Sequence, residues 1–260
     1  MKNIVITGGT SGLGKALAEK YKAEGDNVII LARSASGENG IKCDVGKREE
    51  VERAFEEIAK RFAHIDILIN NAGYGIFGAV EFTKPEDARA IFDVVFFGVF
   101  NCIQCALPLM NNGGKIINIS SASAYFVLPF RSFYSASKAA VNMLSNGLKM
   151  ELKDTDLQVT AICPGNIHTN FSKNRLQNLE TNEHYGITIL KASWRVADEE
   201  HKRMPLEYAV KKIAKIIGKR KLKAEYIIGF KYKLLHFAAR FVPKSWIMAV
   251  SAKMARNNKH

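Results

Sequence analysis

The chain has 260 residues, a formal net charge of +13 and a hydrophobic fraction of 47%. This hydrophobic content supplies a sizeable core and excludes a disordered protein, and the length suits one α/β domain. We therefore expect residues 1–260 to fold as a single domain.

Apolar runs alternate along the chain with segments of helical periodicity. This alternation predicts a doubly wound α/β fold, in which about seven parallel strands carry helices on both faces. The expected strands are Asn3–Thr7, Asn27–Leu31, Gly40–Cys43, Ile65–Asn70, Lys115–Ser120, Gln158–Cys163 and Ala224–Ile228. The expected helices are Leu13–Glu24, Arg48–Arg61, Pro85–Met110, Ser132–Asp154 and Leu206–Gly218.

One expected connection is too short to hold a helix. Only ten residues separate Arg33, at the end of the second strand, from Asp44, at the end of the third. A crossover that contains a helix needs about a dozen residues or more. We expect a loop here, and a more open edge of the sheet.

The chain runs from Met1 straight into an apolar strand, without a signal-peptide pattern. No stretch approaches the roughly 20 apolar residues of a transmembrane helix. These two observations favour a cytoplasmic location.

Four cysteines, at positions 43, 102, 105 and 163, are too scattered for a disulfide framework. Cys102 and Cys105 form a Cys-x-x-Cys pair in an apolar stretch, with no second Cys or His pair nearby. We expect buried, unreactive cysteines and no metal site.

Lysine and arginine crowd the last sixty residues, and no acidic residue follows Glu225. A solvated basic surface that attracts an anionic cofactor explains this charge, and so does a surface that faces a membrane or an acidic partner. Nucleic-acid binding is not expected, because no recognition motif accompanies the charge.

A glycine-rich turn, Thr7-Gly8-Gly9-Thr10-Ser11-Gly12-Leu13-Gly14, joins the first strand to the first helix. Glycines let a backbone approach a pyrophosphate, which then lies at the positive end of the helix. The position between a strand and a helix indicates nucleotide binding on a Rossmann fold.

Several motifs together resemble those of the short-chain dehydrogenase/reductase family. The turn has the spacing Thr-Gly-x-x-x-Gly-x-Gly, and Asn70-Asn71-Ala72-Gly73 follows the fourth strand. Ser121 precedes a Tyr-x-x-x-Lys pattern formed by Tyr134 and Lys138, and Pro164-Gly165 follows the sixth strand. The resemblance covers residues 1–170 closely, and it implies hydride transfer between a nicotinamide cofactor and a carbonyl or alcohol.

The end of the second strand predicts which cofactor binds. Ala32 stands where the family's NAD-dependent members carry Asp, and Arg33 and Ser34 follow it. A guanidinium is suited to the 2′-phosphate of NADP(H), so NADP(H) is the expected cofactor. By resemblance, Asp44 and Val45 contact adenine, Asn71 supports the ribose side, and Ile167 and Thr169 lie at the nicotinamide amide. The remaining expected contacts are Gly8, Thr10, Ser11, Gly12, Leu13, Gly14, Ala72, Gly73, Pro164 and Gly165, together with Tyr134 and Lys138.

Tyr134 and Lys138 lie four residues apart on a predicted helix, so both side chains share one face. A nearby ammonium favours the phenolate, so we expect Lys138 to lower the pKa of Tyr134. By resemblance, Tyr134 exchanges the proton and Ser121 orients the substrate oxygen. The family spacing selects Ser121 over Ser120 and Ser123.

The sequence departs from the family at Val95, where members usually carry an asparagine that supports a water path to the lysine. Two interpretations stay open: a backbone carbonyl and water maintain the path, or proton delivery is slower. Asn101 is not expected to replace the missing amide, because it lies on another helical face.

After Pro164-Gly165, residues 166–205 correspond to the substrate lid of relatives. Its apolar residues either form a hydrophobic substrate wall or dock the lid: Phe171, Leu176, Leu179, Tyr185, Ile187, Leu190 and Trp194. The segment 231–256 is basic, amphipathic and broken at Pro243. Packing within the protein or against another subunit is favoured over contact with a membrane surface.

The sequence therefore predicts an NADPH-dependent enzyme that reduces an apolar ketone or aldehyde, in a homodimer or homotetramer as in relatives. The alternatives are a non-catalytic NADP-binding regulator and a 3-oxoacyl-thioester reductase of lipid synthesis.

Overall fold

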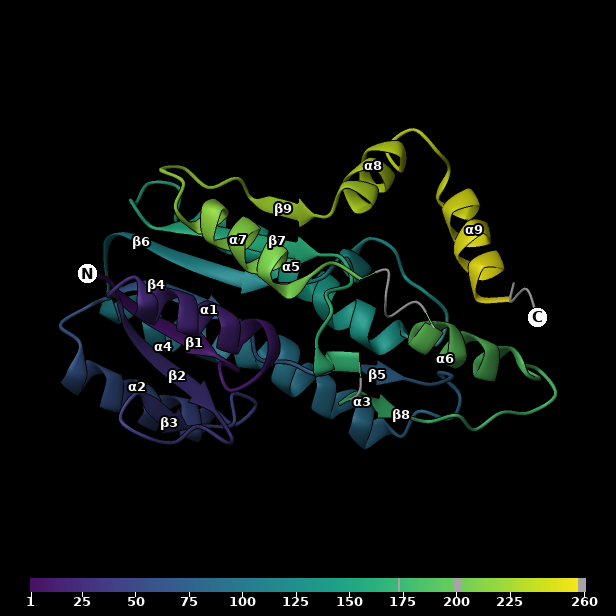
Figure 1. The fold of residues 1–260 in the computed structure, drawn as a ribbon, viewed down its shortest axis with the longest axis horizontal. Helices are drawn as coiled ribbons and strands as arrows, with labels where there is room; N and C mark the ends of the chain where they lie inside the picture. Colours follow the sequence, from purple (N-terminus) through teal and green to yellow (C-terminus); the bar gives the residue numbers. More distant parts are fainter. Residues whose placement is uncertain (173, 199–202, 257–260) are drawn as a thin grey trace.

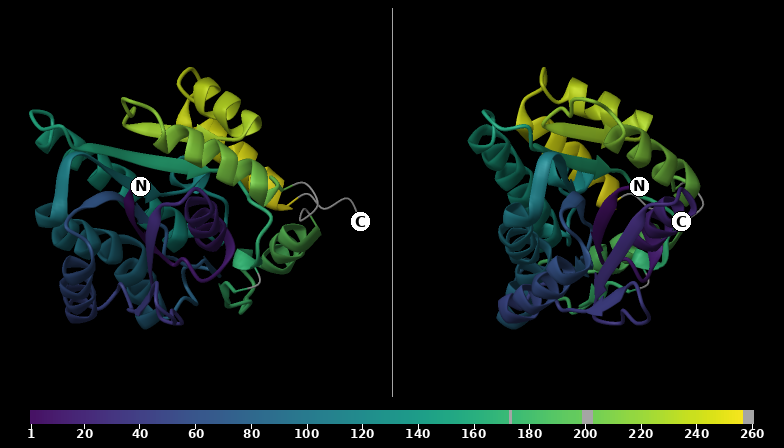
Figure 2. Two further views of the ribbon diagram at one scale, coloured as in Figure 1. Left: turned by 60° about the vertical axis from the view of Figure 1, so that its left-hand side comes forward. Right: turned by 90° about the vertical axis from the view of Figure 1, so that its left-hand side faces the viewer.

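The computed structural model describes residues 1–172, 174–198 and 203–256. Its main sheet has seven parallel strands in the order β3-β2-β1-β4-β6-β7-β9, with helices on both faces (Figure 1, Figure 2). This is the predicted doubly wound fold. The strands are β1 Asn3–Thr7, β2 Asn27–Ala32, β3 Gly40–Lys42, β4 Ile65–Asn70, β6 Met110–Ile119, β7 Gln158–Pro164 and β9 Glu225–Ile228. The helices around the sheet are α1 Gly12–Ala23, α2 Arg48–Arg61, α3 Pro85–Phe92, α4 Gly98–Ala106, α5 Ser132–Glu151 and α7 Leu206–Ile217.

Alternate strand residues supply two cores, one on each face of the sheet. Val5 of β1 belongs to a cluster with Phe55 of α2 and Val141 of α5. Its neighbours Ile4 and Ile6 belong to the other cluster, with residues of α1 and α7. Successive side chains of a strand point to opposite faces, so a strand buried on both sides must be apolar throughout.

No helix lies between β2 and β3. Residues 33–39 form turns and bends, and β3 then pairs in parallel with β2. The loop predicted from the short spacing is confirmed, and the three-residue strand β3 is left at the edge of the sheet.

The helix predicted over Pro85–Met110 is not uniform. A π-helical turn, Asp93–Phe97, separates α3 from α4, and a 3-10 turn, Leu107–Leu109, ends the run. The run Pro85–Leu109 is long and apolar enough to cross a membrane, so the expectation that no such stretch exists was wrong. Ile91, Cys102 and Ala106 are nevertheless fully buried in the core, as expected of a central helix of a globular domain.

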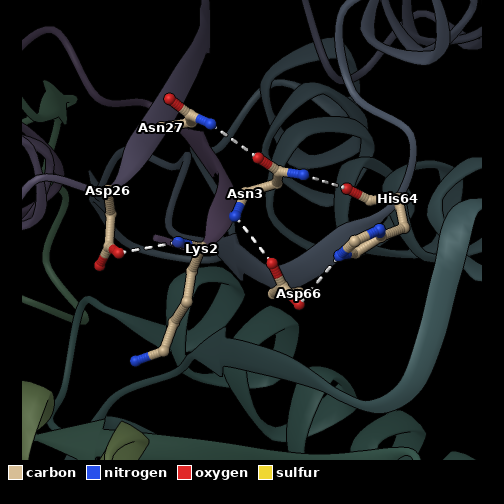
Figure 3. A network of polar contacts seen from close by, with 6 residues as sticks. All are labelled: Lys2, Asn3, Asp26, Asn27, His64 and Asp66. Atoms are coloured by element: carbon tan, nitrogen blue, oxygen red, sulfur yellow. Dashed lines mark hydrogen bonds and ion pairs between the residues drawn. The ribbon is translucent and has the colours of Figure 1, made fainter.

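Polar contacts tie the strands together at their amino ends (Figure 3). The Asn3 backbone N–H donates to Asp66, and the Asn3 side chain donates to the carbonyl of His64. Asn27 donates to the side-chain oxygen of Asn3 at 2.9 Å. These bonds fix the strand starts at the edge opposite the carboxyl ends of the strands.

The cysteines are free, and three of the four are buried. Burial raises the pKa of the Cys43 thiol to about 12 and that of Cys163 to about 11. Cys105 is only half-buried. Such raised pKa values are typical of unreactive thiols.

The lid contains structure that the sequence patterns did not predict. Its short strand β8, Leu176–Gln177, pairs with β5, Ile76–Phe77, and its helix α6 spans Thr188–Asp198. Tyr185 and Leu190 dock the lid onto a small core around Phe77, whereas Ile187 and Trp194 stay exposed. Beyond β9, α8 (Phe230–Ala238) and α9 (Lys244–Arg256) form an arm on either side of Pro243 (Figure 1).

Candidate active site

A cavity of about 470 Å³ lies at the carboxyl ends of the strands, where open α/β sheets bind ligands. Its lining begins at the glycine-rich turn, passes the ends of β2 and β4, and reaches Tyr134 and the lid. Of the residues predicted to bind cofactor or to act in catalysis, Gly14 alone is not in the lining. The predicted residues that do line the cavity are Gly8, Thr10, Ser11, Gly12, Leu13, Arg33, Ser34, Asp44, Val45, Asn71, Ala72, Gly73, Ser121, Tyr134, Lys138, Pro164, Gly165, Ile167 and Thr169.

The turn after β1 needs glycine for two different reasons. Gly8 has a φ of +65°, and a Cβ on it would lie 2.8 Å from the Cα of Ala72. A Cβ on Gly14 would lie 2.4 Å from both the Nδ2 of Asn71 and the carbonyl oxygen of Gly8. Gly14 therefore contributes close packing beneath the turn, while Gly8 contributes a left-handed conformation.

Thr7 and Asn71 lock this turn to the end of β4. The Thr7 Oγ1 accepts the backbone N–H groups of Asn71 and Ala72 at 2.9 and 3.0 Å. The Asn71 Nδ2 donates to the carbonyls of Thr7 and Gly8 at 3.1 and 3.2 Å. Asn71 thus holds the backbone that would carry the cofactor.

The end of β2 places Arg33 and Ser34 at the rim of the cavity, both exposed. The Ser34 hydroxyl lies 3.1 Å from that of Thr10 in the glycine-rich turn. Asp44 follows β3, and its Oδ1 accepts the backbone N–H of Gly46. This end of the cavity therefore presents a guanidinium and two hydroxyls.

Tyr134, in the first turn of α5, is half-buried and lines the cavity. Desolvation raises the pKa of its hydroxyl, while a hydrogen bond from Ser121 and the charges of Arg131 and Arg175 oppose the rise. The expected lowering of this pKa by Lys138 is therefore wrong for this structure. Helical spacing did not reveal the desolvation that outweighs any nearby positive charge.

Lys138 is buried, and its Nζ donates to the backbone carbonyl of Ile119 at 2.7 Å. Burial lowers the pKa of its ammonium group to about 8. The group therefore stays mostly protonated at neutral pH, in a position fixed by the end of β6.

The structure separates the neighbouring serines by their partners. Ser120, Ser121 and Ser123 all line the cavity. The buried Ser120 hydroxyl donates to the carbonyl of Lys138, whereas the Ser121 hydroxyl contacts Tyr134 and accepts the backbone N–H of Ser123. The Ser137 hydroxyl donates to the carbonyl of Tyr134 within the helix at 2.9 Å.

Comparison with known proteins identifies the family. A sequence model described as short chain dehydrogenase matches residues 2–180. The chain belongs to the short-chain dehydrogenase/reductase family. It is an oxidoreductase of that family, acting on CH-OH groups.

Two curated relatives and one solved structure illustrate the relationship. A probable short-chain type dehydrogenase/reductase, VdlC, of Helicobacter pylori is 34% identical over 93% of both chains. A 3-ketodihydrosphingosine reductase of Bacteroides thetaiotaomicron is 37% identical over 76% of both. A short chain dehydrogenase of Burkholderia cenocepacia in complex with NADP is 27% identical, with a TM-score of 0.72 over 92% of this chain and 93% of that one.

The departure from the family at Val95 falls within the π-helical turn. Val95 is fully buried, and a Cβ on Gly73 would lie 3.4 Å from its Cγ2 and 3.8 Å from the Nζ of Lys138. The Asn101 amide instead donates to the carbonyl of Val45, so it does not replace the missing side chain. π-Turns are frequent at functional sites, and this one adjoins the short-chain dehydrogenase lysine.

Sequence reasoning missed three arginines that line the substrate side of the cavity: Arg131, Arg175 and Arg203. It did name Phe171, whose ring lies 5.8 Å from that of Tyr134. Arg175 and Arg203 are visible as basic residues of the lid, but in a chain with a net charge of +13 they did not stand out as site residues.

Proposed function

We propose that this protein is an NADPH-dependent reductase of ketones or aldehydes whose substrates are largely apolar. The supporting observation is one cavity that holds Ser121, Tyr134 and Lys138 at one end and Arg33 at the other. No carboxylate follows β2, where an NAD-dependent enzyme would need one for the ribose hydroxyls.

The cavity suits such a cofactor sterically and electrostatically. Gly8 and Gly14 bring backbone close to Ala72 and Asn71, so the start of α1 is open for a pyrophosphate. Arg33 and Ser34 would hold the 2′-phosphate, and Lys138 would hold the nicotinamide ribose. When bound, the cofactor supplies the hydride.

The side chains supply the proton and the electrostatic support. Because burial raises the pKa of Tyr134, its hydroxyl is protonated at neutral pH and donates a proton to the carbonyl oxygen. Ser121 donates a hydrogen bond to the same oxygen as negative charge develops there. The buried ammonium of Lys138 remains mostly charged at neutral pH and would hold the cofactor ribose.

Apolar residues around the catalytic side chains support an apolar substrate. The lining there includes Ile76, Phe77, Leu128, Pro129 and Phe171. The Bacteroides relative is named as a reductase of a ketone, which favours the reductive direction. Exposed Phe97, Phe100, Met143 and Met150 on the helical surface support a homodimer or homotetramer, and light scattering would test it.

Fluorescence titration with NADPH and NADH, followed by NADPH consumption on a ketone and aldehyde panel, tests the proposal. We expect tighter binding of NADPH and turnover of apolar carbonyls. Binding without turnover on a broad panel would favour the non-catalytic regulator. Turnover confined to 3-oxoacyl thioesters would favour the lipid-synthesis reductase, and tighter NADH binding would contradict the role of Arg33.

A further inference from the structure

Arg175 reaches the substrate side of the cavity from the lid, directly before β8. A Cβ on Gly75 would lie 3.2 Å from the Cγ of Arg175, and the guanidinium carbon lies 5.3 Å from the centre of the Phe77 ring. The backbone on one side and the aromatic ring on the other fix the guanidinium in place.

The Arg175 Nε is buried and has no hydrogen-bond partner. Arg48 and Arg61, by contrast, form ion pairs with glutamates on the surface. A buried charged donor without a partner is costly, so such a group is more typical of a binding site than of a structural contact.

The surrounding charge is positive. Arg131 and Arg203 line the same cavity, and Asp44, at the adenine end, is the one carboxylate among the described lining residues. Burial and these two arginines lower the pKa of Arg175 to about 10, so it stays charged at neutral pH. Arg131 and Arg203 have other interactions, whereas the Nε of Arg175 is a buried donor without a partner.

We propose that Arg175 binds an anionic group of the substrate, a carboxylate or a phosphate, while the carbonyl lies at Tyr134. This inference rests on the proposed reductase function. Phe171 lies near both residues, because its ring lies 5.8 Å from that of Tyr134 and its Cε1 and the Arg175 Cγ both approach Gly75. The substrate class is an oxo compound with an apolar chain and an oxyanion.

Matched substrate pairs test this assignment. One pair is a medium-chain oxo fatty acid and its methyl ester, and the other is the phosphate ester of a hydroxyketone and the free hydroxyketone. We expect the anionic member of one pair to have the higher kcat/KM, by about 10- to 100-fold. The pair that shows the preference identifies carboxylate or phosphate.

Arg175→Gln should abolish this preference by raising KM for the anionic member far more than for the neutral member. Arg89→Gln, which removes an exposed charge from α3, is the matched control and should keep the preference. An equal loss of kcat/KM for both members of a pair, together with a shifted pH profile, would show instead that Arg175 acts on Tyr134. A wild type without any preference, or the same loss in Arg89→Gln, also overturns the assignment.

Calorimetry separates failure of this inference from failure of the reductase proposal. If no carbonyl is reduced, binding of the oxo acid and of the hydroxyketone phosphate is compared between wild type and Arg175→Gln. Weaker binding in the variant supports the anion site even then, and equal or absent binding of both probes overturns it. If only the neutral compounds are reduced, the proposed reductase function holds and the proposed anion site is rejected.

The arm carries a second inference, from an independent observation. No residue of α8 is buried, and large apolar side chains are exposed along both arm helices. They include Phe230, Leu234, Phe237, Phe241, Trp246, Met248 and Val250. Packing into the core of this chain, one of the outcomes favoured for the segment, is therefore wrong for these side chains.

The charge of the arm selects among possible partners. Residues 230–256 contain Lys231, Lys233, Arg240, Lys244, Lys253 and Arg256 with no acidic residue. A second copy of this arm would bring the same positive charge, so contact between two arms is disfavoured. An anionic bilayer complements the charge, and aromatic rings flanked by lysine suit its interface.

The geometry points to the arm as a surface that binds anionic membranes. We expect the full chain to co-sediment with vesicles of phosphatidylcholine mixed with phosphatidylglycerol, and not with phosphatidylcholine alone. Salt should weaken the binding, and the combined variant Phe237→Ser, Phe241→Ser, Trp246→Ser should weaken it by about tenfold or more.

Val80→Ser, which removes an exposed apolar side chain outside the arm, is the control and should bind vesicles as the wild type does. Absence of wild-type binding to the mixed vesicles at low salt would overturn the inference. A change of oligomeric state in the triple variant, with unchanged vesicle binding, would assign the arm to subunit contact instead.

Discussion

The two ends of the cavity differ in how their polar groups are satisfied. At the cofactor end, Thr7 and Asn71 bind each other's backbone, and glycines fit against the facing chain without space for a Cβ. At the substrate end, the Nε of Arg175 is buried without a partner. One end is completed by the chain itself, whereas the other keeps a charged donor for a ligand.

This difference indicates that the cofactor end is preorganised, while selectivity for the substrate resides in the lid. The comparison makes specific predictions, because changes at the two ends should affect different steps of the reaction.

The largest effect is expected for Tyr134→Phe, which removes the proton donor and keeps the ring. The reductase kcat should fall by about 10²- to 10⁴-fold. NADPH affinity, measured by fluorescence titration, should change little, because the cofactor end is intact. A variant that keeps near-normal turnover would transfer the proton-donor role to another group.

Arg33→Gln should weaken binding of NADPH by about 10- to 100-fold and leave NADH binding nearly unchanged. The physical reason is loss of a charge-assisted hydrogen bond to the 2′-phosphate. Titration with both cofactors measures the effect. Equal weakening of both would show that Arg33 does not discriminate between them.

Gly14→Ala should destabilise the cofactor end, because its Cβ would lie 2.4 Å from the carbonyl oxygen of Gly8. The expected loss of unfolding free energy is about 1–3 kcal/mol by urea denaturation. Gly147→Ala is the matched control, since no atom lies within 4 Å of its Cβ. In the helix α5 that substitution should raise stability by up to about 1 kcal/mol.

The pH dependence is expected to be the smallest effect near neutrality. The pKa of Lys138 is lowered to about 8, so its positive charge is present below that pH and is lost as pH rises through it. Reductase kcat should therefore decrease above pH 8. A profile that stays flat to pH 10 would mean that bound cofactor restores the pKa of this lysine.

The sequence allowed much of the cofactor end to be predicted, because its residues lie next to strand ends within short motifs. The ten-residue spacing between Arg33 and Asp44 also correctly predicted the missing helix. The environment of Tyr134 was not predictable in this way, because its desolvation depends on residues far along the chain. Arg175 escaped prediction for the same reason, since its position depends on the pairing of β8 with β5.

The missing helix has a consequence for how the protein avoids self-association. β3 is the outer strand of the sheet, so only one of its two sides pairs with another strand of that sheet. Such edges invite another chain to extend the sheet, and brevity and lysine are common protections. Here the strand has only three residues, and its last, Lys42, is exposed. A longer or uncharged β3 would turn this edge into a nucleus for aggregation.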